Sequence, residues 1–135
     1  MSKIAFDLDG VLVPDCEEIP NLGGLDEFYA LTHYMRPLFS PAGEYAIITA
    51  RHAKYRAVTV GWCQTWLDPF PTQIFHESLN ETAGAYKEHV LNNHPYIQTY
   101  VESDIGIVNY LRNNVKTGCK IIHFSEYIEQ EFYRG

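Results

Sequence analysis

The chain has 135 residues, enough for a single domain with its own apolar core, and we expect one domain over residues 1–135. Its 17 acidic and 10 basic side chains give a formal net charge of −7, which argues against broad, non-specific binding to the phosphate backbone of nucleic acids. Three cysteines without a Cys-x-x-Cys pair are typical of reduced thiols in a cytoplasmic protein. The apolar run near the N-terminus is too short and too acidic to span a membrane.

Apolar runs alternate with segments of helical periodicity along the chain. The runs that favour β-strands are KIAFDL, EYAIITA, TQIFH, IQTYVE and CKIIHF, at residues 3–8, 44–50, 72–76, 97–102 and 119–124. Helices are predicted at residues 25–35, 53–67, 82–92, 105–114 and 125–133, the last with Ser125 as its N-cap. This alternation predicts an α/β fold: a three-layer, doubly wound (Rossmann-like) sheet of about five parallel strands, with helices on both faces.

Polar side chains stand at the ends of three of these strands. They are Asp7 and Asp9 after the first strand, Thr49 and Arg51 at the end of the second, and Glu102 and Asp104 at the end of the fourth. Ligands bind at the carboxyl ends of parallel strands, so we expect these groups to share one rim with Lys87, near the start of the preceding helix. A cation and a lysine at this rim would offset the cost of ending an apolar run in two acids.

Four short motifs in this order resemble those of the haloacid dehalogenase-like (HAD) phosphohydrolases of the small, capless type. FDLDGVL matches the family's Asp-x-Asp-Gly-Val/Thr motif at every defining position, and IITAR matches its apolar strand ending in Thr. Lys87 is the best candidate for the family's lysine, and YVESD for its acidic cluster after a strand. The resemblance covers essentially the whole chain and implies a core without a sizeable cap domain, with a short flap over residues 11–24 as its only lid.

The resemblance also implies a mechanism that these residue types can support. Asp7 would attack the phosphorus of a phosphate monoester, while Asp9 protonates the leaving oxygen and later activates water. Lys87 and the Thr49 hydroxyl would stabilise the phosphate oxygens, and Gly10 would let the chain turn beneath them. Mg²⁺ would bridge the Asp7 carboxylate, the Asp9 carbonyl oxygen, an acid of the fourth motif and the phosphate.

The fourth motif departs from the family pattern, which is often Asp-Asp or Gly-Asp-x-x-x-Asp. Glu102 and Asp104 are both candidate metal ligands, and Ser103 is a candidate through a water molecule. The cluster also has an ordinary structural interpretation, because Ser103 and Asp104 are good N-cap residues for the helix that follows. Arg51 and Arg56 are candidate substrate-binding residues, because basic side chains in the first turn of a helix are mildly unfavourable without a binding role.

The absence of a cap implies an open site, which suits an exposed or macromolecular phosphate, or a site that a second subunit of a homo-oligomer closes. ITARHAKYRAVTVGWCQTWL also looks like the phosphatase cores of nucleotidases and polynucleotide 3′-phosphatases. We therefore expect a Mg²⁺-dependent phosphatase for a phosphorylated small molecule, such as a nucleotide, or for a nucleic-acid 3′-phosphate end. The alternatives are a phosphate- or protein-binding module with weak or no turnover, and a phosphotransferase that uses an acceptor other than water.

Overall fold

The computed structural model describes residues 2–14, 25–77 and 80–132, and its core is one five-stranded sheet. The strands are β1 (Ile4–Phe6), β2 (Ala46–His52), β3 (Ile74–Glu77), β4 (Thr99–Glu102) and β5 (Lys120–His123). They are all paired in parallel and follow the order β3-β2-β1-β4-β5. The chain thus winds outward from the central β1 to one edge and then to the other. The predicted doubly wound α/β sheet is confirmed.

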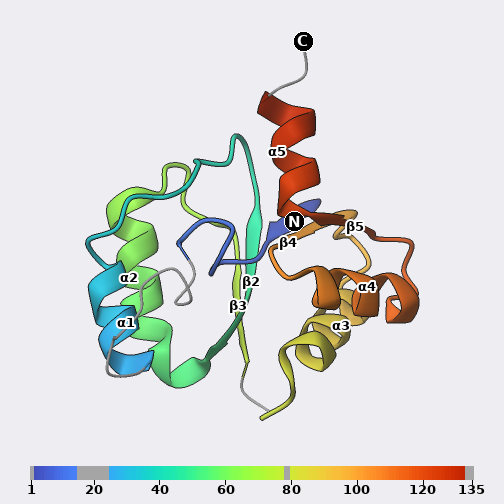
Figure 1. Cartoon of the computed structure of the whole chain (residues 1–135), viewed down its shortest axis with the longest axis horizontal. Helices are drawn as coiled ribbons and strands as arrows, with labels where there is room; N and C mark the ends of the chain where they lie inside the picture. Colours follow the sequence, from blue (N-terminus) through green and yellow to red (C-terminus); the bar gives the residue numbers. More distant parts are fainter. Residues whose placement is uncertain (1, 15–24, 78–79, 133–135) are drawn as a thin grey trace.

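Helices cover both faces of this sheet, as Figure 1 shows. One face carries α3 (Ala83–Asn93) and α4 (Ile105–Asn114). The other carries α2 (Arg56–Trp66), which the short 3₁₀ helix η2 (Ala53–Tyr55) precedes, and α5 (Phe124–Phe132), while α1 (Leu25–Thr32) packs against α2. Within the described residues, no insertion of cap-domain size interrupts the alternation of strands and helices.

The apolar strands are buried because each of their faces packs against a helical layer. Successive residues alternate between the two layers: Ala5 lies in the layer of α3 and α4, and Phe6 in the layer of α2 and α5. In β2, Ile48 and Ile47 divide between the same two layers. Burial on both faces explains why these strands read as continuous apolar runs rather than as alternating ones.

A tight turn follows β1 at the carboxyl end of the sheet. The Leu8 carbonyl accepts hydrogen bonds from the N–H groups of residues 11–13, and Gly10 adopts a φ of 87°, which an L-side chain tolerates poorly. Residues 11–13 are fully buried in the core. The predicted flap over residues 11–24 therefore begins inside the core, and its residues 15–24 lie outside the described part of the chain.

The helix boundaries differ by one to three residues, at one or both ends, from those predicted, except over residues 105–114, and two of the differences have a clear local cause. The helix expected over residues 25–35 ends at Thr32, whose hydroxyl donates to the Tyr29 carbonyl oxygen at 2.7 Å and so takes up an acceptor of the last turn. The prediction that Ser125 caps the last helix is wrong, because α5 begins at Phe124. The Ser125 N–H instead donates to His123 Nδ1 at 3.2 Å, so the imidazole satisfies a group that a capping side chain would otherwise satisfy.

Candidate active site

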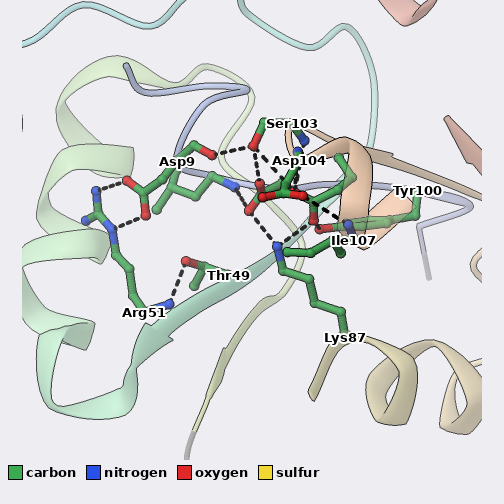
Figure 2. A network of polar contacts seen from close by, with 11 residues as sticks. Asp9, Thr49, Arg51, Lys87, Tyr100, Ser103, Asp104 and Ile107 are labelled. Atoms are coloured by element: carbon green, nitrogen blue, oxygen red, sulfur yellow. Dashed lines mark hydrogen bonds and ion pairs between the residues drawn. The ribbon is translucent and has the colours of Figure 1, made fainter. Parts of the chain in front are cut away.

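The carboxyl ends of β1, β2 and β4 bring most of the predicted site residues to one rim. Asp7 follows β1 directly, Thr49 lies in β2, Glu102 ends β4, and Lys87 reaches the rim from α3. Figure 2 shows the polar network that joins these elements. The parallel topology explains why Asp7, Thr49 and Glu102 meet, because it places all strand ends of one direction at the same edge of the sheet, and α3 adds Lys87 from the helical layer.

The Asp7 carboxylate is nearly buried, with a relative exposure of 5%. Its Oδ1 accepts hydrogen bonds from the Leu8 N–H at 2.9 Å and from Lys87 Nζ at 3.1 Å, and its Oδ2 accepts one from the Ser103 hydroxyl at 3.0 Å. Burial raises the pKa of the Asp7 carboxyl well above its ordinary value, an effect that the Lys87 ammonium opposes and the Glu102 carboxylate reinforces. A further cation at Oδ2 would favour the ionised, nucleophilic form.

Lys87 and Glu102 form the buried ion pair of the site, with Nζ and Oε1 2.6 Å apart. Burial alone would lower the pKa of Lys87, but the Asp7 and Glu102 carboxylates raise it above its ordinary value. Burial alone would raise the pKa of Glu102, but the Lys87 ammonium and hydrogen bonds hold it below its ordinary value. Lys87 therefore stays protonated between two carboxylates, one of them the candidate nucleophile.

Glu102 has further donors around it. Its Oε1 accepts from the Tyr100 hydroxyl at 2.7 Å, and its Oε2 accepts from the N–H groups of Ser103 at 2.9 Å and Asp104 at 3.0 Å. The predicted ligand role of Glu102 thus competes with these donors, with Lys87 and, at 3.4 Å from Oε2, with the Ser103 hydroxyl. Tyr100 was not among the predicted site residues, although its spacing of two from Glu102 places both side chains on one face of β4.

Asp104, the other predicted carboxylate ligand, joins this network through its backbone N–H, while its side chain is engaged at the start of the next helix. It is exposed and is the N-cap of α4, where its Oδ1 accepts from the Ile107 N–H at 3.0 Å. The capping role that the sequence pattern allowed is therefore confirmed. Ser103 lies further inside, with its Oγ 3.0 Å from Asp7 Oδ2 and 3.1 Å from the Asp9 carbonyl oxygen.

Asp9 is bound by Arg51 through two hydrogen bonds. Arg51 Nε lies 3.0 Å from Asp9 Oδ2, and Nη2 lies 2.7 Å from Oδ1 (Figure 2). The guanidinium is held in turn by the Thr59 hydroxyl at 3.1 Å and lies 4.1 Å from the centre of the Tyr29 ring. Arg51, which was predicted to bind substrate, is only 2% exposed and instead orients the candidate acid, Asp9. Arg56, the other predicted substrate-binding arginine, is exposed at the start of α2.

Thr49 is fully buried, and its Oγ1 accepts a hydrogen bond from the Arg51 N–H at 3.1 Å. This bond lies where the pairing of β2 with β3 becomes irregular, between Thr49 and His52, and it helps to fix the backbone of Arg51. Gly10 stands in the turn that separates Asp9 from the core. Both predicted residues therefore lie beside the polar network, and their predicted contact with a phosphate stays a prediction.

A cavity of about 370 Å³ opens beside this network, at the carboxyl end of β2. Its described lining is Tyr29, Ala50, His52, Lys54, Tyr55 and Asn80. The two tyrosine rings meet edge to face with their centres 4.6 Å apart, and Lys54 Nζ lies 5.0 Å from the Tyr55 ring centre. Since Tyr29 also contacts Arg51, one guanidinium separates this aromatic cavity from the Asp9 carboxylate.

Possible metal donors at the rim are oxygens of mixed type. Among the described residues, no group of three or more histidine, cysteine, aspartate or glutamate side chains is placed to hold a metal ion. The converging oxygens are instead one carboxylate, one backbone carbonyl and one hydroxyl, from Asp7, Asp9 and Ser103. Hard oxygen donors of this kind suit Mg²⁺.

In the described residues no helix is both long and apolar enough to cross a bilayer.

Comparison with known proteins gives one similar structure. No family model and no curated protein matches the sequence. A chain in the solved "Structure of the Pnkp1/Rnl/Hen1 RNA repair complex" superposes with a TM-score of 0.65 and 11% sequence identity, over 89% of this chain. This chain spans 41% of that chain's length. At such low identity the likeness establishes the fold, a Rossmann-like α/β core, and leaves the chemistry to the site itself.

Proposed function

We propose that this protein is a Mg²⁺-dependent phosphomonoester hydrolase of the HAD type that acts through an aspartyl-phosphate on Asp7. The observation that carries the proposal is the pairing of a nearly buried Asp7 carboxylate with the Lys87 ammonium, 3.1 Å away, next to a second carboxylate two residues on. A phosphate dianion needs positive charge beside an anionic nucleophile, and Lys87 is positioned to supply part of it.

In the first step an Asp7 oxygen attacks phosphorus, and the bond from phosphorus to the leaving oxygen breaks while Asp9 gives that oxygen a proton. In the second step water attacks the phosphorus of the aspartyl-phosphate, Asp9 takes a proton from the water, and Asp7 is released with inorganic phosphate. Arg51 hydrogen-bonds to both oxygens of the Asp9 carboxylate and so fixes its orientation; one of these two bonds has to open before that oxygen can carry the proton for the leaving group.

The residues at the rim fit a Mg²⁺ ion. The Asp7 carboxylate and the Asp9 carbonyl oxygen would hold it, and both already point at one hydroxyl, that of Ser103. When bound, the ion supplies charge that offsets the repulsion between the Asp7 carboxylate and a phosphate dianion. Lys87 adds a fixed positive charge on the opposite oxygen of Asp7, Oδ1.

For the substrate we propose a nucleoside phosphate, either free or at a nucleic-acid 3′ end. The cavity next to Arg51 supports this choice, because its lining combines the partly exposed Tyr55 ring, which can contact a base, with the Lys54 ammonium, which can pair with a phosphate. Lys54 and Arg56 are exposed beside this cavity and at the start of α2, where they add positive charge to a protein with a net charge of −7. The similar structure is that of an RNA repair complex, which is compatible with a nucleic-acid end as substrate.

The test is hydrolysis of an aryl phosphate, a panel of nucleotides and an oligonucleotide 3′-phosphate, each with and without Mg²⁺. We expect Mg²⁺-dependent release of phosphate by the parent and a loss of at least about 10³-fold in Asp7→Asn, because the nucleophile is removed. Glu126→Gln is the matched control, since it neutralises an exposed carboxylate that pairs with Arg112 on the surface.

Other outcomes lead to the alternative functions. If the parent protein binds phosphate but hydrolyses no substrate, it is a binding module. The pairing of Asp9 with Arg51 is compatible with this function as well, because binding does not need Asp9 as an acid. Phosphate release that rises with an added alcohol acceptor, with formation of a new ester, identifies a phosphotransferase. Turnover that survives in Asp7→Asn contradicts the proposed chemistry.

A further inference from the structure

The hydroxyl of Ser103 occupies an unusual place between two oxygens of the β1 end. Its Oγ lies 3.0 Å from Asp7 Oδ2 and 3.1 Å from the Asp9 carbonyl oxygen. A hydroxyl carries one proton and two lone pairs, so when Asp7 is ionised these three electron-rich oxygens share one proton. This convergence is what a hard cation would relieve.

The two distances from Ser103 Oγ are those of hydrogen bonds, and they also leave these oxygens close enough together to share one small cation. Mg²⁺ binds six oxygens at about 2.0–2.1 Å in a nearly ideal octahedron, whose neighbouring corners are therefore about 3.0 Å apart. Both distances from Ser103 Oγ agree with that edge length. If the Ser103 hydroxyl rotated its proton away from Asp7 and Asp9, its oxygen could help these two residues to hold the ion.

The neighbouring carboxylates are committed elsewhere. Glu102 Oε1 accepts hydrogen bonds from Lys87 Nζ and the Tyr100 hydroxyl, and Oε2 accepts from two backbone N–H groups. A shift of Glu102 onto a metal would leave the buried Lys87 ammonium with one carboxylate fewer, which is costly at 2% exposure. Asp104 is exposed and caps α4, so its use as a ligand would uncap the helix.

The peptide of Ser103 is braced on both sides. His123 Nε2 lies 2.8 Å from the Ser103 carbonyl oxygen, and since Nδ1 of the same ring accepts from Ser125, Nε2 is the donor. The Ser103 N–H donates to Glu102 Oε2, which also lies 3.4 Å from Ser103 Oγ. When a cation binds the lone pairs of Ser103 Oγ, the hydroxyl proton can therefore be donated to Glu102 Oε2.

We propose that the Ser103 hydroxyl, rather than the carboxylate of Glu102 or Asp104, is the third protein ligand of the metal, beside Asp7 Oδ2 and the Asp9 carbonyl oxygen. The assignment rests on the proposed function for its choice of Mg²⁺. It gives Glu102 a different task, which is to orient the ligand and to hold Lys87. Only one of the three ligands is charged, so the free protein binds the ion weakly and a phosphate dianion strengthens that binding.

The first experiment measures binding of Mn²⁺ alone, a spectroscopic substitute for Mg²⁺ at oxygen sites, by electron paramagnetic resonance. Ser103→Ala should weaken binding by at least about tenfold, in the range seen when groups around a metal are removed. Ser103→Asp should strengthen binding, because it adds a charged oxygen. Asp104→Asn should bind as the parent does, since asparagine keeps the helix cap. Circular dichroism of each variant checks that it is folded.

The second experiment tests direct ligation by exchanging the ligand atom. Ser103→Cys should bind Mg²⁺ worse and Zn²⁺ better than the parent, because a thiolate prefers the softer ion. The parent, which has the same three natural cysteines, gives the Zn²⁺ baseline. Replacing a merely structural hydroxyl would not shift the relative affinity from Mg²⁺ toward Zn²⁺ in this way.

The outcomes separate the two proposals. Mn²⁺ binding that is unchanged in Ser103→Ala, or lost in Asp104→Asn, overturns the assignment of Ser103 but leaves the phosphatase proposal standing. Mn²⁺ binding that is also unchanged in Asp7→Asn shows that the ion lies elsewhere, and the metal-dependent function proposed above fails with it.

Discussion

The hydroxyl of Tyr100 shows how a single residue supports the buried charges of the rim. It donates to Glu102 Oε1 at 2.7 Å, and both residues are at most 1% exposed. Tyr100→Phe keeps the ring but leaves the buried carboxylate with one donor fewer. We expect the free energy of unfolding to fall by about 1–3 kcal/mol, measured by urea denaturation. Tyr34→Phe, at a ring that is 77% exposed, is the control and should stay within about 0.5 kcal/mol of the parent. Equal losses in both variants would contradict this role.

Single residues also show where sequence patterns stop being informative. The strand ends predicted that Asp7, Lys87 and Glu102 share a rim, because parallel topology follows from the order of strands and helices. The pairing of Asp9 with Arg51 could not be predicted in this way. Its geometry depends on how Thr59 and the Tyr29 ring hold the guanidinium, and such side-chain packing has no signature in the spacing of residues.

At the scale of elements, the start of α4 serves both the fold and the site. Asp104 caps the helix, while Ser103, one residue earlier, meets the oxygens of Asp7 and Asp9. Asp104→Ala should lower the free energy of unfolding by about 1 kcal/mol, and Asp104→Asn by a few tenths at most, because only alanine removes the capping oxygen. Urea denaturation of the two variants checks this. Equal losses would show that charge, rather than the cap, stabilises this helix end.

The elements themselves were mostly predictable, and the errors have local causes. The helix over residues 105–114 has the predicted bounds, because a capping aspartate precedes it and the apolar spacing is regular. The last helix starts one residue earlier than expected, since the His123 imidazole provides the acceptor that Ser125 was expected to provide. A histidine is a rare capping residue, so the sequence favoured the serine.

At the scale of the whole molecule, one half-buried histidine connects stability to pH. His76 lies in β3 beside Thr49 of β2, and neither ring nitrogen has a hydrogen-bond partner within the described residues. Burial lowers the pKa of His76 from 6.5 to about 4; the guanidinium of Arg56 adds to this effect, a contact with the Arg51 backbone opposes it, and the Arg51 guanidinium adds a smaller part. The imidazole is therefore neutral in the folded protein at pH 7.

The sign of the effect follows from proton binding in the two states. Between pH 6.5 and about 4 the unfolded chain binds a proton at His76 that the folded protein does not, so stability rises with pH in this window and is lost as the pH falls through it. Between pH 7 and 5 we expect the parent to lose about 1–2 kcal/mol more than His76→Phe, whose ring cannot be protonated. Urea denaturation of both proteins at the two pH values measures this difference. Parallel losses would place the acid sensitivity in other groups, with the Asp7, Lys87 and Glu102 network the next to examine, because its charges are buried as well.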